Sequence, residues 1–372
     1  MSKIRVLIVD DAVVIRRMLS SVIETDPNME VAGIAANGKI ALQKIPQCNP
    51  DLVTLDIEMP EMDGIATLRE IRKTWPRLPV VMVSTLTARG AAGTIDALNA
   101  GATDYVTKPA NLGKIVEGLE AIEKELLPKI RGICAHLIGH ATGATPAPAA
   151  GSHAPAARIG APSAPRPAGP PPPRREPFAC VAIGTSTGGP NALQTLFGQI
   201  AAAPPVPIFI VQHMPPLFTA MLAERLGKCG PVQFHEGADG MEPLPGHAYL
   251  APGGKHMVVA REAGRVRIHL NENPPENSCR PAVDPMFRSL AEVYGAHVLA
   301  LVMTGMGQDG LRGCEHVRER GGTVLTQDEP TSVVWGMPGY VTNAGLSSAV
   351  LPLAHIAPEI ERRIRENRRL AA

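Results

Sequence analysis

The sequence has little of what marks several common classes of protein. Aromatic residues make up only 3% of its 372 residues, too few for the stacking platforms that bind single-stranded nucleic acid. Lysine plus arginine (36) and aspartate plus glutamate (35) nearly cancel, and the net charge is +1. Such a balance argues against attraction to nucleic acid or to a membrane surface. No apolar run approaches the ~20 residues that a membrane span needs. We therefore expect no nucleic acid partner and no membrane insertion.

Cysteine pairs with metal-binding or redox spacing are also missing. The six cysteines are widely scattered, at Cys48, Cys134, Cys180, Cys229, Cys279 and Cys314. Because no C-x-x-C pair occurs, a zinc ribbon or a redox dithiol is not expected, and nothing suggests a disulfide framework. The chain opens with MSKIRVLIVDD, which does not resemble a secretory signal. These features favour the reducing cytoplasm.

Proline is abundant and unevenly distributed. Eleven of the 37 prolines fall between Pro146 and Pro177, and Ile159 is the only large aliphatic residue of 141–177. Such a segment cannot bury enough apolar surface to offset its ordering entropy, so we predict a disordered linker that is Pro/Ala-rich from about residue 141. A proline-rich signalling ligand is the alternative. The linker divides the chain into three expected parts, 1–125, 126–177 and 178–372.

Both flanking parts alternate strand and helix patterns, which predicts βαβ units and parallel sheets. In the first part we expect strands at Ile4–Val9, Met29–Ala35, Leu52–Leu55, Val80–Ser84 and Tyr105–Thr107. In the second we expect strands at Ala179–Gly184, Pro207–Gln212 and Val298–Thr304, and helices at Pro190–Gln199, Leu217–Gly227 and Asp309–Arg320. Short runs bounded by Gly and Pro predict a β-hairpin insertion within 231–270.

Acidic residues follow two strands of the first part. Asp10 and Asp11 come directly after the first strand, and Asp56 comes directly after the third. Carboxyl ends of strands in a doubly wound sheet share one crevice, so these carboxylates should converge and be neutralised by a hard cation such as Mg²⁺. Ser84 and Lys108 end the fourth and fifth strands, and a hydroxyl, an ammonium and a metal around one carboxylate suit a transferred phosphoryl group. Singly, each residue is more often a turn acid, a helix cap or a surface lysine.

Serine, histidine and aspartate follow three strands of the second part. Ser186 lies in GTSTG, between a strand and a helix, which matches the nucleophile-elbow pattern G-x-S-x-G. His213 ends the next strand, and Asp309 follows a third strand. Alone, His213 would be structural and Asp309 a helix N-cap. Together at one sheet edge they predict a nucleophile, a general base and its orienting acid, with the Met306 N–H as candidate oxyanion donor.

The first part resembles the response-regulator receiver domains. The motifs VLIVDD, DLVTLDIEMPEMDG, VVMVST and DYVTKP occur in that family's order and spacing. The resemblance implies phosphorylation of Asp56 and Mg²⁺ held by Asp10, Asp11, Asp56 and the backbone carbonyl of Glu58. It further implies that Ser84 and Lys108 contact the phosphoryl group and that Tyr105 is the aromatic switch residue.

The second part resembles the catalytic domain of the bacterial chemotaxis protein-glutamate methylesterases. The motifs are IGTSTGGP, VQHMP, YLAPGGKHM, RPAVDPMF, MTGMGQDG and TSVVWGMP. The resemblance implies a triad of Ser186, His213 and Asp309 with Thr187 close by, and no cofactor for the esterase. Thr185 stands where relatives commonly have alanine. His256, Asp284, Trp335 and Met337 lie in family-like motifs but are given no chemical role.

The resemblance implies a phosphorylation-activated hydrolase of glutamate 5-methyl esters on chemoreceptors. It would release methanol, deamidate selected receptor glutamines and take its phosphoryl group from a chemotaxis histidine kinase. The expected fold is a flavodoxin-like receiver and a Rossmann-like methylesterase domain, both doubly wound α/β. Three other classes compete: a gated interaction module without catalysis, a nucleotide-binding oxidoreductase, and a DNA-binding output domain. The intact Ser, His and Asp, the lack of G-x-G-x-x-G spacing and the near-neutral charge argue against them in turn.

Overall fold

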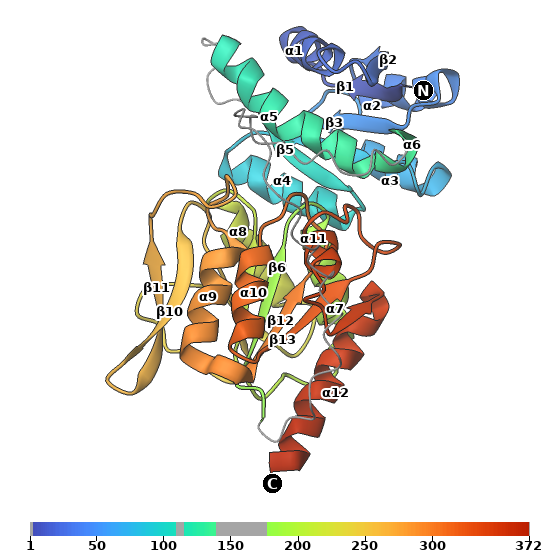
Figure 1. Ribbon diagram of the computed structural model, residues 1–372. Coiled ribbons are helices and arrows are strands. Elements are labelled where there is room, and N and C mark those ends of the chain that lie inside the picture. Colours follow the sequence, from blue (N-terminus) through green and yellow to red (C-terminus); the bar gives the residue numbers. More distant parts are fainter. Residues whose placement is uncertain (1–2, 109–114, 139–176, 372) are drawn as a thin grey trace, which may run out of the picture.

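The computed structural model describes the chain except for residues 1–2, 109–114, 139–176 and 372. Two parallel β-sheets form, one before and one after the undescribed stretch 139–176 (Figure 1). This confirms the predicted fold class of two parallel-sheet α/β domains. The stretch predicted as a Pro/Ala-rich linker lies outside the described residues up to residue 176. No helix of the described residues is both long and apolar enough to cross a membrane.

The first sheet has five parallel strands in the order β2-β1-β3-β4-β5. Its strands are β1 (Ile4–Val9), β2 (Met29–Ala35), β3 (Leu52–Asp56), β4 (Val80–Ser84) and β5 (Asp104–Thr107). The helices are α1 (Val13–Glu24), α2 (Gly38–Cys48), α3 (Gly64–Thr74), α4 (Ala88–Asn99), α5 (Ile115–Ile133) and α6 (Ala135–Ile138). Every strand predicted here is confirmed to within one residue at each end.

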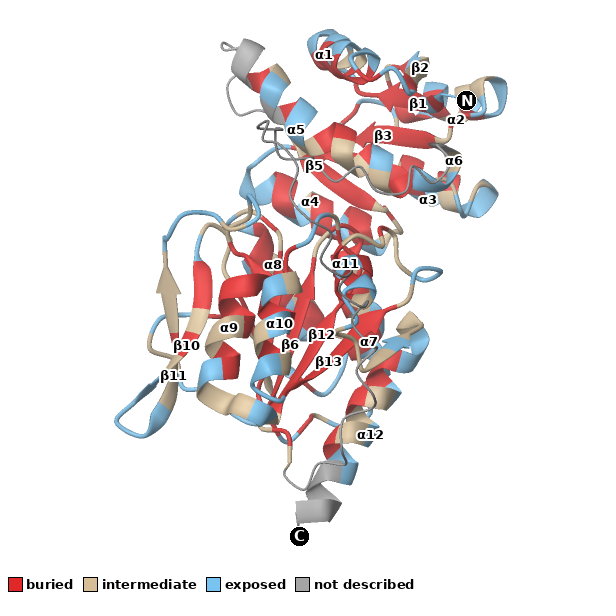
Figure 2. Ribbon diagram, viewed as in Figure 1, coloured by how far each residue is buried: buried red, intermediate tan, exposed pale blue. Residues whose placement is uncertain are grey.

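Helices cover both faces of this sheet, and the strand residues alternate between them. Ile4, Val6 and Ile8 pack in one cluster with residues of α1 and α5. Leu7 and Val9 pack in another cluster with residues of α2, α3 and α4. The central strands β3 and β4 are buried throughout, whereas the edge strand β2 is largely half-buried, as the colours of Figure 2 show. The carboxyl ends of the strands are left as the open edge that collects polar residues.

The second sheet has seven parallel strands in the order β14-β13-β12-β6-β7-β9-β8. They are β6 (Cys180–Thr185), β7 (Ile208–Gln212), β8 (Gln233–Glu236), β9 (His247–Leu250), β12 (Val298–Val302), β13 (Thr323–Gln327) and β14 (Ala349–Leu351). The helices are α7 (Gly189–Gln199), α8 (Phe218–Leu226), α9 (Val283–Tyr294), α10 (Leu311–Glu319), α11 (Met337–Asn343) and α12 (Leu353–Ala371), and a 3₁₀ turn (Gly295–His297) precedes β12.

The prediction of a hairpin insertion over 231–270 is only partly correct. An antiparallel hairpin does form, from β10 (His256–Glu262) and β11 (Arg265–Asn271). The runs before it are instead β8 and β9, which join the main sheet in parallel. A short edge strand and a hairpin strand have the same composition, and only their tertiary partners separate them.

Strand β6 lies at the centre of the second sheet, between β7 and β12. The chain leaves β6 toward β7 and returns later on the other side, so the strand ends around β6 form the topological switch point where such sheets build sites. Helix α9 approaches β6 closely, because a Cβ at Gly184 would lie only 2.5 Å from Val283 Cγ1. This contact brings the first turn of α9 to the same edge.

The two domains are in contact through α4 and α8 (Figure 1). Ala102, Tyr105 and Ile95 of the first domain share one buried cluster with Met214 and Phe218 of the second. The contact is therefore apolar at its centre, and polar bonds surround it.

Candidate functional site

The acidic residues predicted to converge do meet at the edge of the first sheet. Carboxylate oxygens of Asp10, Asp11 and Asp56 lie within 4.8 Å of one another. Lys108 bridges two of them, with Nζ 2.9 Å from Asp10 Oδ2 and 2.8 Å from Asp56 Oδ2. Asp10 and Asp56 are buried, whereas Asp11 is exposed. One ammonium group cannot neutralise so many carboxylates, so the cluster has spare negative charge and only oxygen donors, which fits a hard divalent cation.

Burial dominates the electrostatics of this cluster. It raises the pKa of Asp56; Lys108 opposes and Asp10 adds to the rise, and the pKa reaches about 6. Burial lowers the pKa of Lys108, but Asp56 and Asp10 outweigh it and the pKa is raised overall. Lys108 is thus held as an ammonium ion facing an acidic group that titrates just below neutral pH.

Three further residues predicted for this site lie at different places around it. Ser84 is buried at the end of β4, and its Oγ donates to the Gly90 carbonyl over 3.0 Å. The Glu58 side chain pairs with Arg89 at 3.0 Å on the surface. Tyr105 points into the domain contact, where its ring stacks on Phe218 with centroids 5.1 Å apart.

In the second domain, His213 and Asp309 meet as predicted. Asp309 is not the N-cap of α10, which is Gly310. His213 follows β7 directly, and its Nε2 lies 2.7 Å from Asp309 Oδ2. Asp309 is 2% exposed, yet both its oxygens have donors, which are Val283 N (2.6 Å), Asp284 N (3.1 Å), Gly310 N (3.0 Å) and Asn277 Nδ2 (3.0 Å).

These hydrogen-bond donors determine which atom of the His213–Asp309 pair carries the proton. Burial raises the pKa of Asp309, but the hydrogen bond and charge of His213 and the backbone N–H groups lower it below its usual value. An ionised carboxylate only accepts hydrogen bonds, so Nε2 of His213 must carry the proton. The lone pair of the neutral imidazole is then on Nδ1, so that nitrogen is the one free to accept a proton.

Ser186 sits on a tightly held turn after β6. Its N–H donates to the Thr304 carbonyl (3.0 Å), and its carbonyl accepts from Gln212 Nε2 (3.0 Å). The buried Thr185 hydroxyl, the departure noted in the sequence, also donates to the Thr304 carbonyl (2.9 Å). A Cβ at Gly305 would lie 2.9 Å from Ser186 Cβ, so only glycine fits beside Ser186.

The candidate oxyanion residues lie beside this turn. Thr187 is buried, and its carbonyl accepts from Thr304 Oγ1 over 2.9 Å. Among the hydrogen bonds of the described residues, none has the Met306 N–H as donor. No hydrogen bond of the described residues joins Ser186 Oγ to His213 either. The structure therefore brings His213 and Asp309 into contact, but it does not bring Ser186 Oγ into hydrogen-bond contact with His213.

Sequence reasoning missed the residues that surround His213 and Asp309. Asn277 bridges the carboxylates of Asp284 and Asp309 at 2.9 and 3.0 Å. Asp284 in turn accepts from Gly310 N and Gly313 N. Cys279 Sγ lies 3.4 Å from His213 Nδ1. RPAVDPMF flagged Asp284, but nothing in the spacing of Asn277 and Cys279 signals these contacts.

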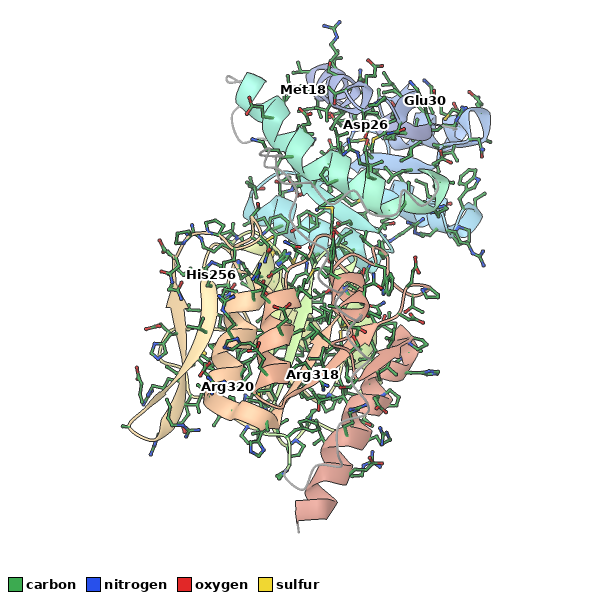
Figure 3. The ribbon with its side chains drawn as sticks, in the orientation of Figure 1. Met18, Asp26, Glu30, His256, Arg318 and Arg320 are labelled. Carbon is green, nitrogen blue, oxygen red and sulfur yellow. The ribbon has the colours of Figure 1, made fainter. Side chains whose placement is uncertain are left out.

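His256 proves structural. It is labelled in Figure 3 at the start of β10, is 1% exposed, and its Nδ1 accepts from Ala282 N over 3.2 Å. Its Nε2 then donates to the Pro274 carbonyl, also over 3.2 Å. Trp335 donates from Nε1 to the Gln327 carbonyl, and Met337 is fully buried.

Both domains match families of known proteins. A family model described as "CheB methylesterase" matches residues 181–360, and one described as "Response regulator receiver domain" matches residues 6–120. The chain is 49% identical to the "Protein-glutamate methylesterase/protein-glutamine glutaminase" of Trichodesmium erythraeum, over 98% of this chain and 100% of that protein. A protein of the same name from a Nocardioides species is 49% identical over 99% of this chain and 97% of its own length.

A solved structure also resembles the second domain. It is the Thermotoga maritima CheB methylesterase catalytic domain, with 39% identity and a TM-score of 0.49 over 50% of this chain and 98% of that one.

The acidic cluster generates a prediction about cation binding. Because a cation competes with the proton of Asp56, whose pKa is about 6, the affinity for Mg²⁺ should rise as pH increases through 6. At pH 5 it should be about tenfold weaker than at the plateau above pH 7. Calorimetric titration of the full chain with Mg²⁺ measures this. The Asp56→Asn variant is the control and should lose this pH dependence; a wild-type affinity that is flat from pH 5 to 7 contradicts the assignment.

Proposed function

The chain belongs to the CheB methylesterase family, and from this premise we propose that it hydrolyses 5-methyl esters of glutamate residues on chemoreceptors. It releases methanol, and by the same acyl chemistry it deamidates selected receptor glutamines with release of ammonia. The observation that carries the proposal is the 2.7 Å contact of His213 Nε2 with the buried Asp309, at the sheet edge that also holds Ser186. The proposed domains are a receiver at 1–125, a linker at 126–177 and the methylesterase at 178–372; helix α5 (Ile115–Ile133) continues from the receiver into the start of the proposed linker.

The first step is acylation of Ser186. Its Oγ attacks the ester carbonyl while His213 Nδ1 takes the hydroxyl proton, and Asp309 stabilises the imidazolium that forms. The Met306 N–H, which has no partner among the described residues, stabilises the oxyanion, with Thr187 alongside. His213 then gives its proton to the departing methoxide.

The second step is hydrolysis of the acyl-enzyme. His213, now neutral, takes a proton from water, the hydroxide attacks the acyl carbon, and Ser186 leaves with a proton from His213. The proposed esterase reaction uses these side chains and needs no cofactor. For glutamine substrates the same sequence applies with ammonia as the leaving group.

The receiver domain makes the hydrolase dependent on phosphorylation, with Asp56 as the proposed acceptor. Receiver phosphorylation generally depends on Mg²⁺, and Asp10, Asp11, Asp56 and the Glu58 carbonyl would hold that ion. The ion supplies charge neutralisation for the incoming phosphoryl group. Lys108 and Ser84 contact the group, and Tyr105 is the switch residue. A chemotaxis histidine kinase is the proposed donor, and the cytoplasm, where the six free thiols stay reduced, is the proposed location.

The contact between the two domains would transmit a change in the receiver domain to the esterase domain. Asn191 Nδ2 donates to the Ala102 carbonyl (2.8 Å), and Arg225 Nη1 donates to the Ile95 carbonyl (2.7 Å). Helix α5 also reaches the catalytic domain, since a Cβ at Gly132 would lie 3.1 Å from Val334 Cγ2. Val334 is bonded to Thr304 and Gly305, next to the oxyanion residue.

Phosphorylation would therefore act by weakening this contact. Unphosphorylated, the receiver restricts access to the triad and holds the loop that carries Met306. A changed position of Tyr105, stacked on Phe218, would favour the open arrangement.

The catalytic assignment predicts that Ser186→Ala abolishes methanol release, because no other group in the proposed reaction attacks the ester. The measurement is methanol released from methylated receptor in membrane vesicles. Ser21→Ala, which changes an exposed serine on α1, is the control and should keep wild-type activity. Methanol release by a folded Ser186→Ala protein would refute the assignment.

The regulatory assignment predicts that Asn191→Ala with Arg225→Ala raises the basal esterase rate without any phosphodonor. Each interfacial hydrogen bond contributes about 1 kcal/mol, so losing both, about 2 kcal/mol, should raise the open population and the rate by roughly thirtyfold. Lys228→Ala is the control, because the Lys228 ammonium pairs with Glu224 of α8 and has no described hydrogen bond or ion pair with the first domain. Equal basal rates for the double variant and the control would argue against autoinhibition by this contact.

A further inference from the structure

The base nitrogen of His213 faces a thiol. Cys279 Sγ lies 3.4 Å from His213 Nδ1, within hydrogen-bonding distance for sulfur. The other nitrogen, Nε2, is committed to Asp309 at 2.7 Å. Nδ1 must take the proton of Ser186, so Cys279 occupies the one position on the ring that the proposed reaction needs.

Backbone hydrogen bonds fix the conformation of the turn that carries Cys279. Glu276 and Cys279 exchange backbone hydrogen bonds of 3.2 and 2.8 Å, and the residues between them, Asn277 and Ser278, have φ of 51° and 62°. Two adjacent residues at positive φ characterise a type I′ turn, for which asparagine is favoured.

The same turn is bonded to Asp309 and to helix α9. Asn277 Nδ2 donates to Asp309 Oδ1 over 3.0 Å, and Glu276 forms a bidentate pair with Arg288 of α9 at 2.9 and 2.6 Å. Sulfur, imidazole and carboxylate are thus held by one connected set of bonds. The position of Sγ is therefore not that of a loose surface thiol.

We propose that Cys279 is a positioning residue of the esterase reaction, whose Sγ is the resting partner of His213 Nδ1 and controls when that nitrogen can take the Ser186 proton. The inference rests on the proposed function, because it requires Ser186 as nucleophile and His213 as base. In the protonated ring, Nδ1–H donates to sulfur; once the ring loses this proton, the lone pair is available to Ser186.

The groups around the ring set the expected pH dependence. Asp309 and Cys279 face His213 directly; Asp284 of α9 lies behind Asp309, and the Arg288–Glu276 pair lies beyond. Burial lowers the pKa of His213, but the hydrogen bonds with Asp309 and Cys279 outweigh it and raise the pKa to about 10. The ring keeps its proton below this pH, so the esterase rate should climb through alkaline pH.

The test is the pH profile of kcat/KM for methanol release by the full chain, which reports the free enzyme's essential base. Cys279→Ala removes the sulfur acceptor and should move the midpoint of the acid limb about one pH unit lower, the effect of losing one hydrogen bond to a charged group. Cys279→Ser retains an acceptor and should recover part of the shift. An unchanged midpoint in Cys279→Ala overturns the proposal.

The matched control is Cys229→Ala. Cys229 is half-buried like Cys279, but its Sγ contacts the Arg225 carbonyl on α8 rather than the triad. Its midpoint should equal that of the wild type, which would separate loss of this thiol from loss of any thiol.

Alkylation tests the same point without a variant at Cys279. With iodoacetamide, Sγ bonds to the methylene carbon, iodide leaves and the thiol proton passes to solvent. The added group would cover Nδ1, so esterase activity should be lost in the wild type and in Cys229→Ala but retained in Cys279→Ser. Full activity after mass spectrometry shows complete alkylation of Cys279 overturns the proposal.

Failure of this inference and failure of the proposed function give different results. If the wild-type chain releases no methanol from methylated receptor, the proposed function fails and the role of Cys279 fails with it. If Ser186→Ala is inactive and Cys279→Ala keeps the wild-type midpoint, only the role of Cys279 fails.

Discussion

A buried carboxylate, that of Asp309, is the group on which the catalytic domain depends. Removing an ionised carboxylate from water costs several kcal/mol unless it is paired and hydrogen-bonded. Asp309 accepts hydrogen bonds from the first turn of α9, from the start of α10 and from Asn277. It also accepts a hydrogen bond from the proton on Nε2 of His213. These donors come from segments far apart in the chain, so the carboxylate is satisfied only when the whole sheet edge has assembled. The same bonds fix which nitrogen of His213 would act as base in the proposed reaction.

A second network of buried bonds, centred on Thr304, links catalysis to the receiver domain. The Thr304 carbonyl accepts from the Ser186 N–H and the Thr185 hydroxyl, while its own hydroxyl donates to the Thr187 carbonyl. Its Oγ1 also accepts from the N–H of Val334, the residue that α5 touches through Gly132. We therefore propose that a shift of α5 moves the loop beside Ser186, so that the domain contact acts on the chemistry as well as on access.

The sequence pattern predicts the fold and most of the candidate site. The strands show as apolar runs, and the candidate side chains directly follow those runs. Asp56, Ser186 and His213 each follow an apolar run directly, and the parallel sheet then brings such ends together. The residues that contact these side chains could not be predicted from the sequence pattern. Cys279 meets His213 across 66 residues. Strands β8 and β9 fall within the range predicted as a hairpin insertion, because a short strand shows its pairing partner only in the fold.

The proposed function requires a Ser-His-Asp esterase whose rate the receiver domain controls. The most direct test is the rate of methanol release from methylated chemoreceptor by the full-length wild-type chain, with Mg²⁺, measured with and without a small acyl phosphate as phosphodonor. The account predicts measurable release without the donor and a higher rate with it. No release under either condition, or the same rate in both, would contradict it.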